Sequence, residues 1–295
     1  MKEKHFPGVG RTILTVLIHP GLLSRGIRCF FTILYKFFLF QYCAAHFLRL
    51  PVSRVDNALD DVIPFNPGFV RIYLDFTAFW IRIAGFLSIG YGKKGRRYAA
   101  DFISSITNLY SFTFQIYRKN LSTTARPLYK KGFHFRLIHL VDPHLMCIPS
   151  LHVMLVAHSY AAFRYYLRCL GETETQRMLE EKVFNGALAI TEAVLYVKQH
   201  SINCIAATFY TMNCFNSQLF TIADAEKFMY SLFKDKTIND IPKEYVPYYS
   251  EPFVCPDDIV LLRDFILNLY RHFTEKNNDD WTVPIFEFLK TFPLK

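Results

Sequence analysis

The sequence predicts an all-α fold: a polytopic membrane bundle of about six spanning helices with a cytoplasmic helical C-terminal tail. Two observations support this prediction. Apolar residue types make up 52% of the 295 residues and charged types only 20%, against about 25% charged residues in soluble domains. In addition, several stretches approach the roughly 20 mainly apolar residues that a spanning helix requires. The same composition excludes a disordered, collagenous or coiled-coil chain.

Six candidate spans follow one another in the first three quarters of the chain. They are Ile27–Leu48, Gly68–Ile89, Tyr98–Tyr117, Leu151–Leu170, Val183–Val197 and Ile202–Thr221. The third and sixth are rather polar and the fifth is short, so the prediction rests on the whole series. The second contains Arg71, Asp75 and Arg82. These charges should face the bundle interior or lie near an interface, because exposing them to lipid is costly.

Loop charges predict the orientation. The N-terminal arm, residues 1–26, and the loop at 93–97 are basic, whereas the first loop carries Asp60 and Asp61. The positive-inside rule therefore places the arm in the cytoplasm and the first loop outside. The third loop, residues 118–150, falls outside although it is rich in Lys and Arg, which suggests that its cations hold an anion. Short loops and seven scattered cysteines suit a bacterial inner membrane.

The membrane domain is expected to cover residues 27–222 and the tail residues 223–295. Apolar residues recur at helical spacing in Asp257–His272 and Trp281–Lys290. We expect this tail to pack on itself or on the membrane surface, and it has no catalytic signature. The formal charge of +9 comes without a basic run interleaved with aromatic residues, so no nucleic-acid partner is predicted. The oligomeric state stays open.

Three polar clusters lie at predicted helix ends on the outer side. The first contains Lys119, Arg126 and Pro127. A lysine and an arginine separated by six residues can both reach one phosphate if the chain between them folds back, because Arg binds two oxygens and Lys adds a mobile charge. The alternative is a basic loop that meets lipid headgroups.

The second cluster opens the fourth span with the sequence Pro149-Ser150-Leu151-His152. Ser150 suits an N-cap, and the N-terminus of a helix attracts anions. His152 could then donate a proton to a leaving oxygen. The alternative is a capped helix with an interfacial histidine. His144 precedes this cluster closely enough to touch a substrate.

The third cluster, Lys198-Gln199-His200, joins the fifth and sixth spans. A neutral imidazole can attack phosphorus and form a phosphorylated intermediate, and Lys198 could add charge against the phosphoryl oxygens. The alternative is a polar turn between two spans.

Taken in order, the three clusters resemble the signature motifs of the type 2 phosphatidic acid phosphatase and vanadium haloperoxidase superfamily. Pro-Ser-Leu-His and Lys-Gln-His look like the branch that includes inositol phosphorylceramide synthases and related bacterial phosphatases. The segment Ile63–Pro67 is similar to one common in that branch. The resemblance covers roughly residues 61–220.

The resemblance implies a role for each matching residue. His200 would be the nucleophile on phosphorus, and His152 the general acid that protonates the leaving alcohol. Four residues would bind the phosphoryl oxygens: Lys119, Arg126, Ser150 and Lys198. The phosphatases of this superfamily need no metal, so no metal or cofactor is expected.

The third motif departs from the superfamily pattern. Ala193, Val194 and Cys204 stand where members usually have Ser, Arg and Asp. The missing Asp orients the nucleophilic imidazole, and losing such a group can cost several orders of magnitude in rate. Asn203 and Glu192 are possible orienters of the nucleophile in its place.

These observations predict an integral-membrane lipid phosphatase that hydrolyses a lipid phosphomonoester through a phospho-histidine intermediate. Its substrate would be a phospholipid or an isoprenoid phosphate, reached from the outer or periplasmic surface. Two alternatives stay open: a lipid headgroup phosphotransferase similar to inositol phosphorylceramide synthase, and a catalytically degenerate lipid-phosphate binder.

Overall fold

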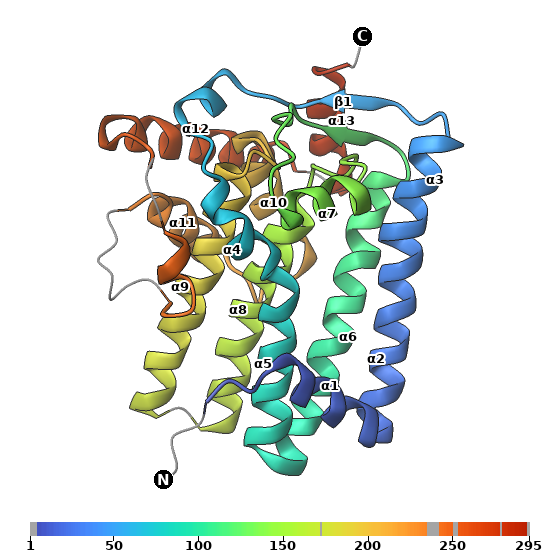
Figure 1. Ribbon diagram of the computed structural model, residues 1–295, viewed down its shortest axis with the longest axis vertical. Coiled ribbons are helices and arrows are strands. Elements are labelled where there is room, and N and C mark those ends of the chain that lie inside the picture. Colours follow the sequence, from blue (N-terminus) through green and yellow to red (C-terminus); the bar gives the residue numbers. More distant parts are fainter. Residues whose placement is uncertain (1–4, 172, 235–241, 250–252, 278, 294–295) are drawn as a thin grey trace.

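The computed structural model describes residues 5–171, 173–234, 242–249, 253–277 and 279–293, and these residues are mostly helical (Figure 1). The all-α class is therefore confirmed. The first four residues of the predicted N-terminal arm and parts of the predicted tail lie outside the described residues.

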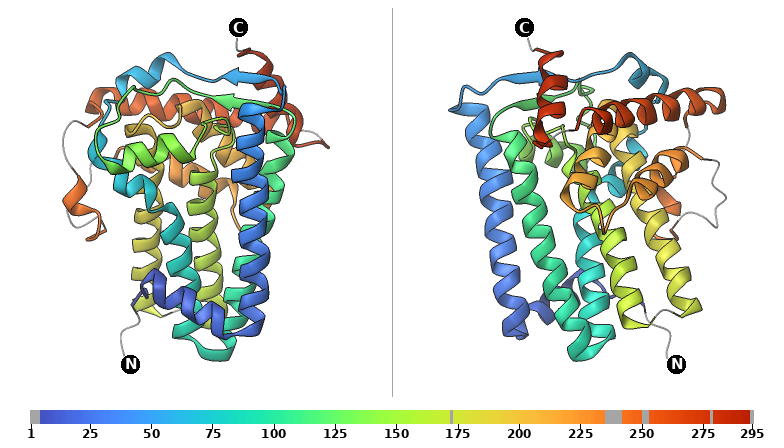
Figure 2. Two further views of the ribbon diagram at one scale, coloured as in Figure 1. Left: turned by 45° about the vertical axis from the view of Figure 1, so that its right-hand side comes forward. Right: turned by 180° about the vertical axis from the view of Figure 1, so that it is seen from behind.

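Long helices lying side by side form the body of the molecule (Figures 1 and 2). They are α2 (Pro20–Ile33) with η1 (Leu34–Leu39) and α3 (Phe40–His46), α5 (Phe76–Gly90), α6 (Gly92–Tyr117), α8 (Leu151–Leu170) and α9 (Glu174–Tyr196). Helix α6 shows why they associate. Its fully buried residues Phe102, Ile106, Leu109, Thr113 and Ile116 recur every three or four positions and form one inward stripe.

Helix α1 (Val9–Ile18) crosses the bundle at the end opposite the strands (Figure 1). It packs on α5 at Gly85, where an added Cβ would lie 2.0 Å from the Thr12 hydroxyl oxygen. The absence of a side chain at Gly85 thus allows the close approach of the two helices.

The other end of the bundle carries the short elements. Strands β1 (Val52–Arg54) and β2 (Leu121–Thr123) pair in parallel, with Val52 opposite Leu121. Around them lie η2 (Ala58–Val62), η3 (Pro67–Phe69), α4 (Val70–Leu74) and α7 (Phe133–Val141). Helix α10 (Ile202–Phe215) begins at this end and has 14 residues.

The predicted C-terminal tail is helical, and it packs on the predicted membrane domain as well as on itself. Its helices are α11 (Ile222–Ser231), η5 (Val246–Tyr248), α12 (Pro256–Glu275) and α13 (Thr282–Lys290). Helix α12 packs along α10, and the Ser53 hydroxyl of β1 donates to the Leu289 carbonyl at 2.8 Å. The predicted apolar stripe is buried inside the protein instead of on a membrane surface, with Leu262 and Ile266 at 0% exposure. The tail therefore lies at the β1–β2 end, opposite the N-terminal arm (Figure 1).

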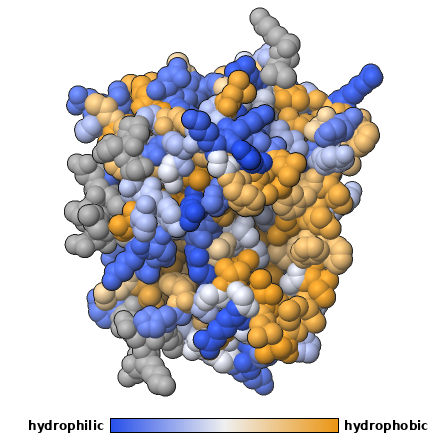
Figure 3. Space-filling model, viewed as in Figure 1, coloured by the Kyte–Doolittle hydropathy of each residue, from blue (hydrophilic) through white to orange (hydrophobic). Residues whose placement is uncertain are grey.

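Two helical segments are long and apolar enough to cross a membrane, Pro20–His46 and Pro67–Gly90. The first exposes large apolar side chains, including Phe30, Phe31 and Tyr35, and Figure 3 shows an apolar face on the side of the molecule where α2 runs. This observation weakly indicates membrane association. The remaining predicted spans are helical in part, but a six-span bundle is not confirmed: α10 ends at Phe215 and measures only about 21 Å.

Candidate active site

A cavity of about 700 Å³ lies at the β1–β2 end of the bundle. Its lining includes these residues from three separate segments: Arg54, Asp56, Asp60, Phe65, Thr124, Arg126, Lys198 and His200. Three of the residues singled out from the sequence, Arg126, Lys198 and His200, thus border one space.

His200 occupies the turn between α9 and α10, and Asp60 holds this turn in place. The Ile202 N–H donates to Asp60 Oδ1 at 2.9 Å, and the Lys198 ammonium donates to the Asp60 carbonyl. Lys198 has a φ of 53°, a left-handed conformation that is costly for a residue with a side chain. Lys198 therefore serves first to fix the turn that presents His200.

His200 meets the second cluster directly. Its Nε2 lies 3.1 Å from the Ser150 hydroxyl oxygen and 3.3 Å from His152 Nδ1. Ser150 takes the predicted N-cap position of α8, but its hydroxyl makes no capping hydrogen bond. The hydroxyl contacts His200 instead, so the prediction was right about the position and wrong about the bond. The N-terminus of α8 nevertheless lies beside His200, where its partial positive charge can act.

Aromatic side chains hold His152 in place. The ring centroids of Tyr73 and Phe76 lie 4.7 and 4.3 Å from that of His152. The Tyr117 hydroxyl donates to the Pro149 carbonyl and ties the start of α8 to the end of α6. Helices far apart in the sequence therefore position the two imidazoles.

Arg126 is the cation that approaches this pair. Its guanidinium forms an ion pair with Asp142, with 2.8 Å between Nη2 and Oδ2, and donates to the Asp142 carbonyl at 3.1 Å. The Arg126 Nε is buried and has no hydrogen-bond partner among the described residues. One donor of Arg126 is thus available to an anion in the cavity. The pairing of Asp142 with Arg126 was not predicted from the sequence.

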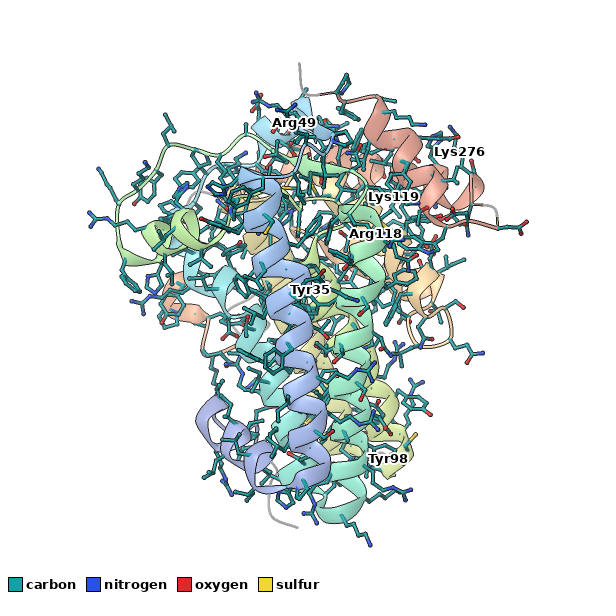
Figure 4. All side chains as sticks on the ribbon, turned by 90° about the vertical axis from the view of Figure 1, so that its right-hand side faces the viewer. Tyr35, Arg49, Tyr98, Arg118, Lys119 and Lys276 are labelled. Carbon is teal, nitrogen blue, oxygen red and sulfur yellow. The ribbon has the colours of Figure 1, made fainter. Side chains whose placement is uncertain are left out.

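Lys119 is not brought to the cavity, contrary to its predicted role in phosphate binding. Its ammonium lies 5.3 Å from the centre of the Phe286 ring of α13, at the end of α6 (Figure 4). The physical reason is strand β2. Residues 121–123 are extended and paired with β1, so the chain runs straight between Lys119 and Arg126 instead of folding back.

We therefore expect Lys119→Ala to lower any activity of this site on a phosphate ester less than fivefold, a difference below about 1 kcal/mol, since this side chain contacts α13 and not the cavity. Arg126→Gln should lower it at least tenfold, because the partly buried cation is lost. Initial rates of phosphate release on matched amounts of folded protein provide the comparison. Equal losses in the two variants would contradict the assignment.

Neither predicted orienter reaches the His200 ring. The amide nitrogen of Asn203 donates to the Val55 carbonyl at 3.2 Å, and its oxygen accepts from Asn57 at 3.3 Å. Glu192 Oε1 accepts the Phe233 N–H at 2.8 Å. His200 Nδ1 is buried and makes no side-chain hydrogen bond among the described residues, although the Cys147 backbone lies close enough to His200 to raise its pKa. Glu192 on α9 and Asn203 on α10 are hydrogen-bonded to other residues. Their closeness to His200 in the sequence therefore does not give its imidazole a partner.

A third imidazole, that of His144, lies near His152 and His200. His144 Nε2 lies 2.8 Å from the Thr124 hydroxyl oxygen, and its ring centroid is 6.4 Å from that of His200. His144 has a φ of 63°, and its N–H donates to Asp142 Oδ1 at 2.8 Å. Asp142 therefore holds both Arg126 and His144 in place, a role that only the fold reveals.

Burial sets the protonation of the loop histidines. It lowers the pKa of His200 well below the usual 6.5, and the neighbouring His152 and His144 lower it further. Burial likewise lowers the pKa of His144, with a second contribution from Arg126. Both imidazoles are thus neutral at pH 7, the form in which an imidazole can act as a nucleophile.

These shifts predict a pH-dependent stability. A histidine whose folded-state pKa lies below its unfolded value stabilises the fold fully above about pH 6.5, and this contribution is lost as the pH falls. We expect the melting temperature in detergent to drop between pH 7 and pH 5, and His144→Asn to show a smaller drop. If the melting temperature falls by the same amount between pH 7 and pH 5 in both proteins, His144 does not contribute.

No protein-family model, curated protein or solved structure matches this chain.

Proposed function

We propose that this protein is an integral-membrane lipid phosphatase that hydrolyses a lipid phosphomonoester through a phospho-histidine intermediate. The observation that supports the proposal is the convergence of Ser150, His152 and His200, within 3.1 and 3.3 Å at His200 Nε2, beside a cavity that Arg126 also lines. Three segments far apart in the sequence meet there, in the order that the superfamily motifs require.

The geometry suits a two-step transfer. A neutral His200 with its proton on Nδ1 keeps the lone pair of Nε2 for attack on phosphorus, while the bond from phosphorus to the lipid oxygen breaks. A bound phosphate dianion favours protonated His152, whose Nδ1 proton passes to the leaving oxygen and yields the alcohol. Water then attacks the phosphohistidine, gives a proton back to His152, and releases inorganic phosphate and His200.

Donors around the cavity would stabilise the phosphoryl oxygens. Arg126 has a free Nε–H, the Ser150 hydroxyl points at His200, and α8 begins at this point. Fixed donors of this kind are the main source of catalysis in phosphoryl transfer. Lys198 adds charge from the cavity wall, although its ammonium is already bound to the Asp60 carbonyl.

We propose a bacterial inner membrane location with the site on the periplasmic side. The basic residues 93–97, predicted as a loop, form the first turns of α6 at the opposite end from the strands (Figure 1), and positive-inside logic places them in the cytoplasm. In this arrangement α2–α3, α5, α6, α8 and α9 cross the bilayer. The short α10 enters only partway, so the C-terminal helices lie on the periplasmic side with the site.

Phosphate release from purified protein tests the proposal. Phosphatidate, phosphatidylglycerophosphate and an isoprenyl phosphate are offered in mixed micelles, with and without an acceptor alcohol. Release of inorganic phosphate that requires both His152 and His200 supports the phosphatase. Headgroup transfer to the acceptor with little free phosphate would identify a phosphotransferase instead.

A second candidate function is a lipid-phosphate binder without turnover. The observation in its favour is the orphaned Nδ1 of His200, combined with the engagement of Arg126 by Asp142. An imidazole whose Nδ1–H has no acceptor is a poorer nucleophile, because nothing stabilises its cationic intermediate. Saturable binding of phosphatidate by the wild type, with no phosphate released over hours, would establish this function.

A further inference from the structure

Helix α7 presents an apolar surface to the outside of the protein, right beside the cavity. Phe133, Leu137 and Leu140 recur at intervals of four and three residues, and their exposed fractions are 73%, 38% and 83%. Leu128, in the segment leading to the helix, is 96% exposed. The opposite side of α7 is buried through Phe135 and Ile138. The helix therefore carries apolar residues on its buried side and also on the side that faces outward.

Cations accompany this apolar row. Lys130, Lys131 and Arg136 are exposed on the same segment, and the Arg136 Nε donates to the Lys130 carbonyl at 3.3 Å, which keeps the guanidinium beside the lysines. Exposed apolar side chains with adjacent cations are the composition of helices that lie in the headgroup layer of an anionic membrane. The described residues of this segment contain no acidic side chain between Leu128 and Val141.

The position of α7 fits this role. It lies across the direction of the long helices and packs on α4, at the strand-bearing end of the bundle, where the exposed apolar segment Pro20–His46 also stops (Figures 1 and 2). If that segment spans the bilayer, α7 lies at the level of the headgroups. A short amphipathic helix lying in the interface plane is then at the depth that its composition requires.

An aromatic contact joins α7 to the cavity. Phe65, which lines the cavity, lies 5.3 Å from Tyr129 and 6.0 Å from Phe135 between ring centroids. Tyr129 and Phe135 are 4.9 Å apart. The same loop carries Arg126 into the cavity two residues before Leu128. The position that α7 takes against a membrane therefore affects where the residues at the edge of the cavity lie.

We propose that residues 128–141 form an interfacial lip that inserts Leu128, Phe133, Leu137 and Leu140 into the outer leaflet of an anionic membrane. This lip holds the mouth of the cavity at the headgroup layer, where a lipid phosphate can reach it while its acyl chains stay in the bilayer. The proposal rests on the proposed function for its purpose, but the insertion itself can be measured independently of any activity.

The chain offers a matched control. Helix α12 exposes Val260 and Leu261 by 61% and 51%, but acidic side chains, Asp257, Asp258 and Asp264, flank them. Two variants carry one added cysteine each, Leu140→Cys and Leu261→Cys, in a Cys255→Ser background that removes the exposed native thiol. Both are labelled with an environment-sensitive fluorophore and reconstituted in vesicles of phosphatidylcholine and phosphatidylglycerol.

We expect the label at 140, but not the one at 261, to shift its emission to the blue and to be quenched by brominated lipids. Replacing Lys130, Lys131 and Arg136 with glutamine should reduce the quenching in anionic vesicles more than in neutral ones. Equal exposure to water at both positions would overturn the proposal. So would a blue shift that appears only when the protein is concentrated in detergent, since a second copy of the chain would then cover α7.

A second measurement addresses the role of the lip in turnover. The variant Leu137→Asp/Leu140→Asp should lower hydrolysis of long-chain phosphatidate in vesicles by roughly tenfold, the loss expected when an apolar side chain no longer enters the bilayer. Hydrolysis of a water-soluble phosphomonoester should stay unchanged. If insertion is observed while neither substrate is hydrolysed, the proposed phosphatase fails and the lip stands. Equal losses on both substrates would overturn the role of the lip in turnover.

Discussion

Phosphate release is expected to fall by a factor of about 10³ or more when His200 is replaced by alanine, because the nucleophile itself is lost. His200 Nε2 is the atom at which Ser150 and His152 meet. His152→Ala should cause a smaller loss, on the order of 10²-fold, since a general acid contributes about 10²–10⁴-fold. The two losses should not add in the double variant, because the residues act in one step.

His158→Asn provides the matched control for His200→Ala. His158 is also buried, on α8, and its Nε2 lies 2.7 Å from the Ser105 hydroxyl oxygen, away from the cavity. This variant should lose stability but keep its activity per folded molecule. Phosphate release and the melting temperature are measured on the same preparations. Full activity in His200→Ala would remove the assigned nucleophile and with it the phospho-histidine intermediate.

The second large effect is a gain. Cys204→Asp is expected to raise the rate tenfold or more, since the superfamily motif places an Asp there to orient the imidazole and stabilise its cationic form. Cys204 is fully buried and lies one helical turn beyond His200 at the start of α10. The orphaned Nδ1 of His200 is the group that a carboxylate would satisfy.

Cys204→Asn is the control for this gain, because it offers the ring an oxygen without the charge. The aspartate variant buries a carboxylate, which costs stability unless it is paired, so the melting temperature should fall unless His200 accepts the charge. Rates are compared at pH 7 for the three proteins. A lower or unchanged rate in Cys204→Asp, with the fold intact, would contradict the alignment of the third motif.

Local sequence patterns anticipated much of the architecture. The apolar stretches became long helices, with α6 and α8 ending at or beside the predicted boundaries, because amphipathic spacing and the start of a helix at Ser150 are local properties. The pairing of Ser150, His152 and His200 was also anticipated, since each motif lies at a helix end and helix ends meet where loops are short.

Long-range packing decided the rest. Lys119 is held at α13 and separated from Arg126 by a strand pairing across 69 residues of sequence, and parallel pairing of that kind has no short-range sequence signal. The roles of Asp60 and Asp142 depend on which loop lies beside which. The packing of the tail on α10 was not predicted, because an apolar stripe specifies that a helix must be buried without specifying what covers it.

By itself the sequence determined that this protein is helical, where α8 and α10 begin, and which imidazoles and cations stand at helix ends, because periodicity and capping depend on nearby residues only. The tertiary structure alone decided that Asp60 fixes the His200 turn, that Asp142 holds Arg126, and that Asn203 and Glu192 face other partners. These are contacts between distant segments, and a side chain's partner there is set by the packing of whole helices and strands.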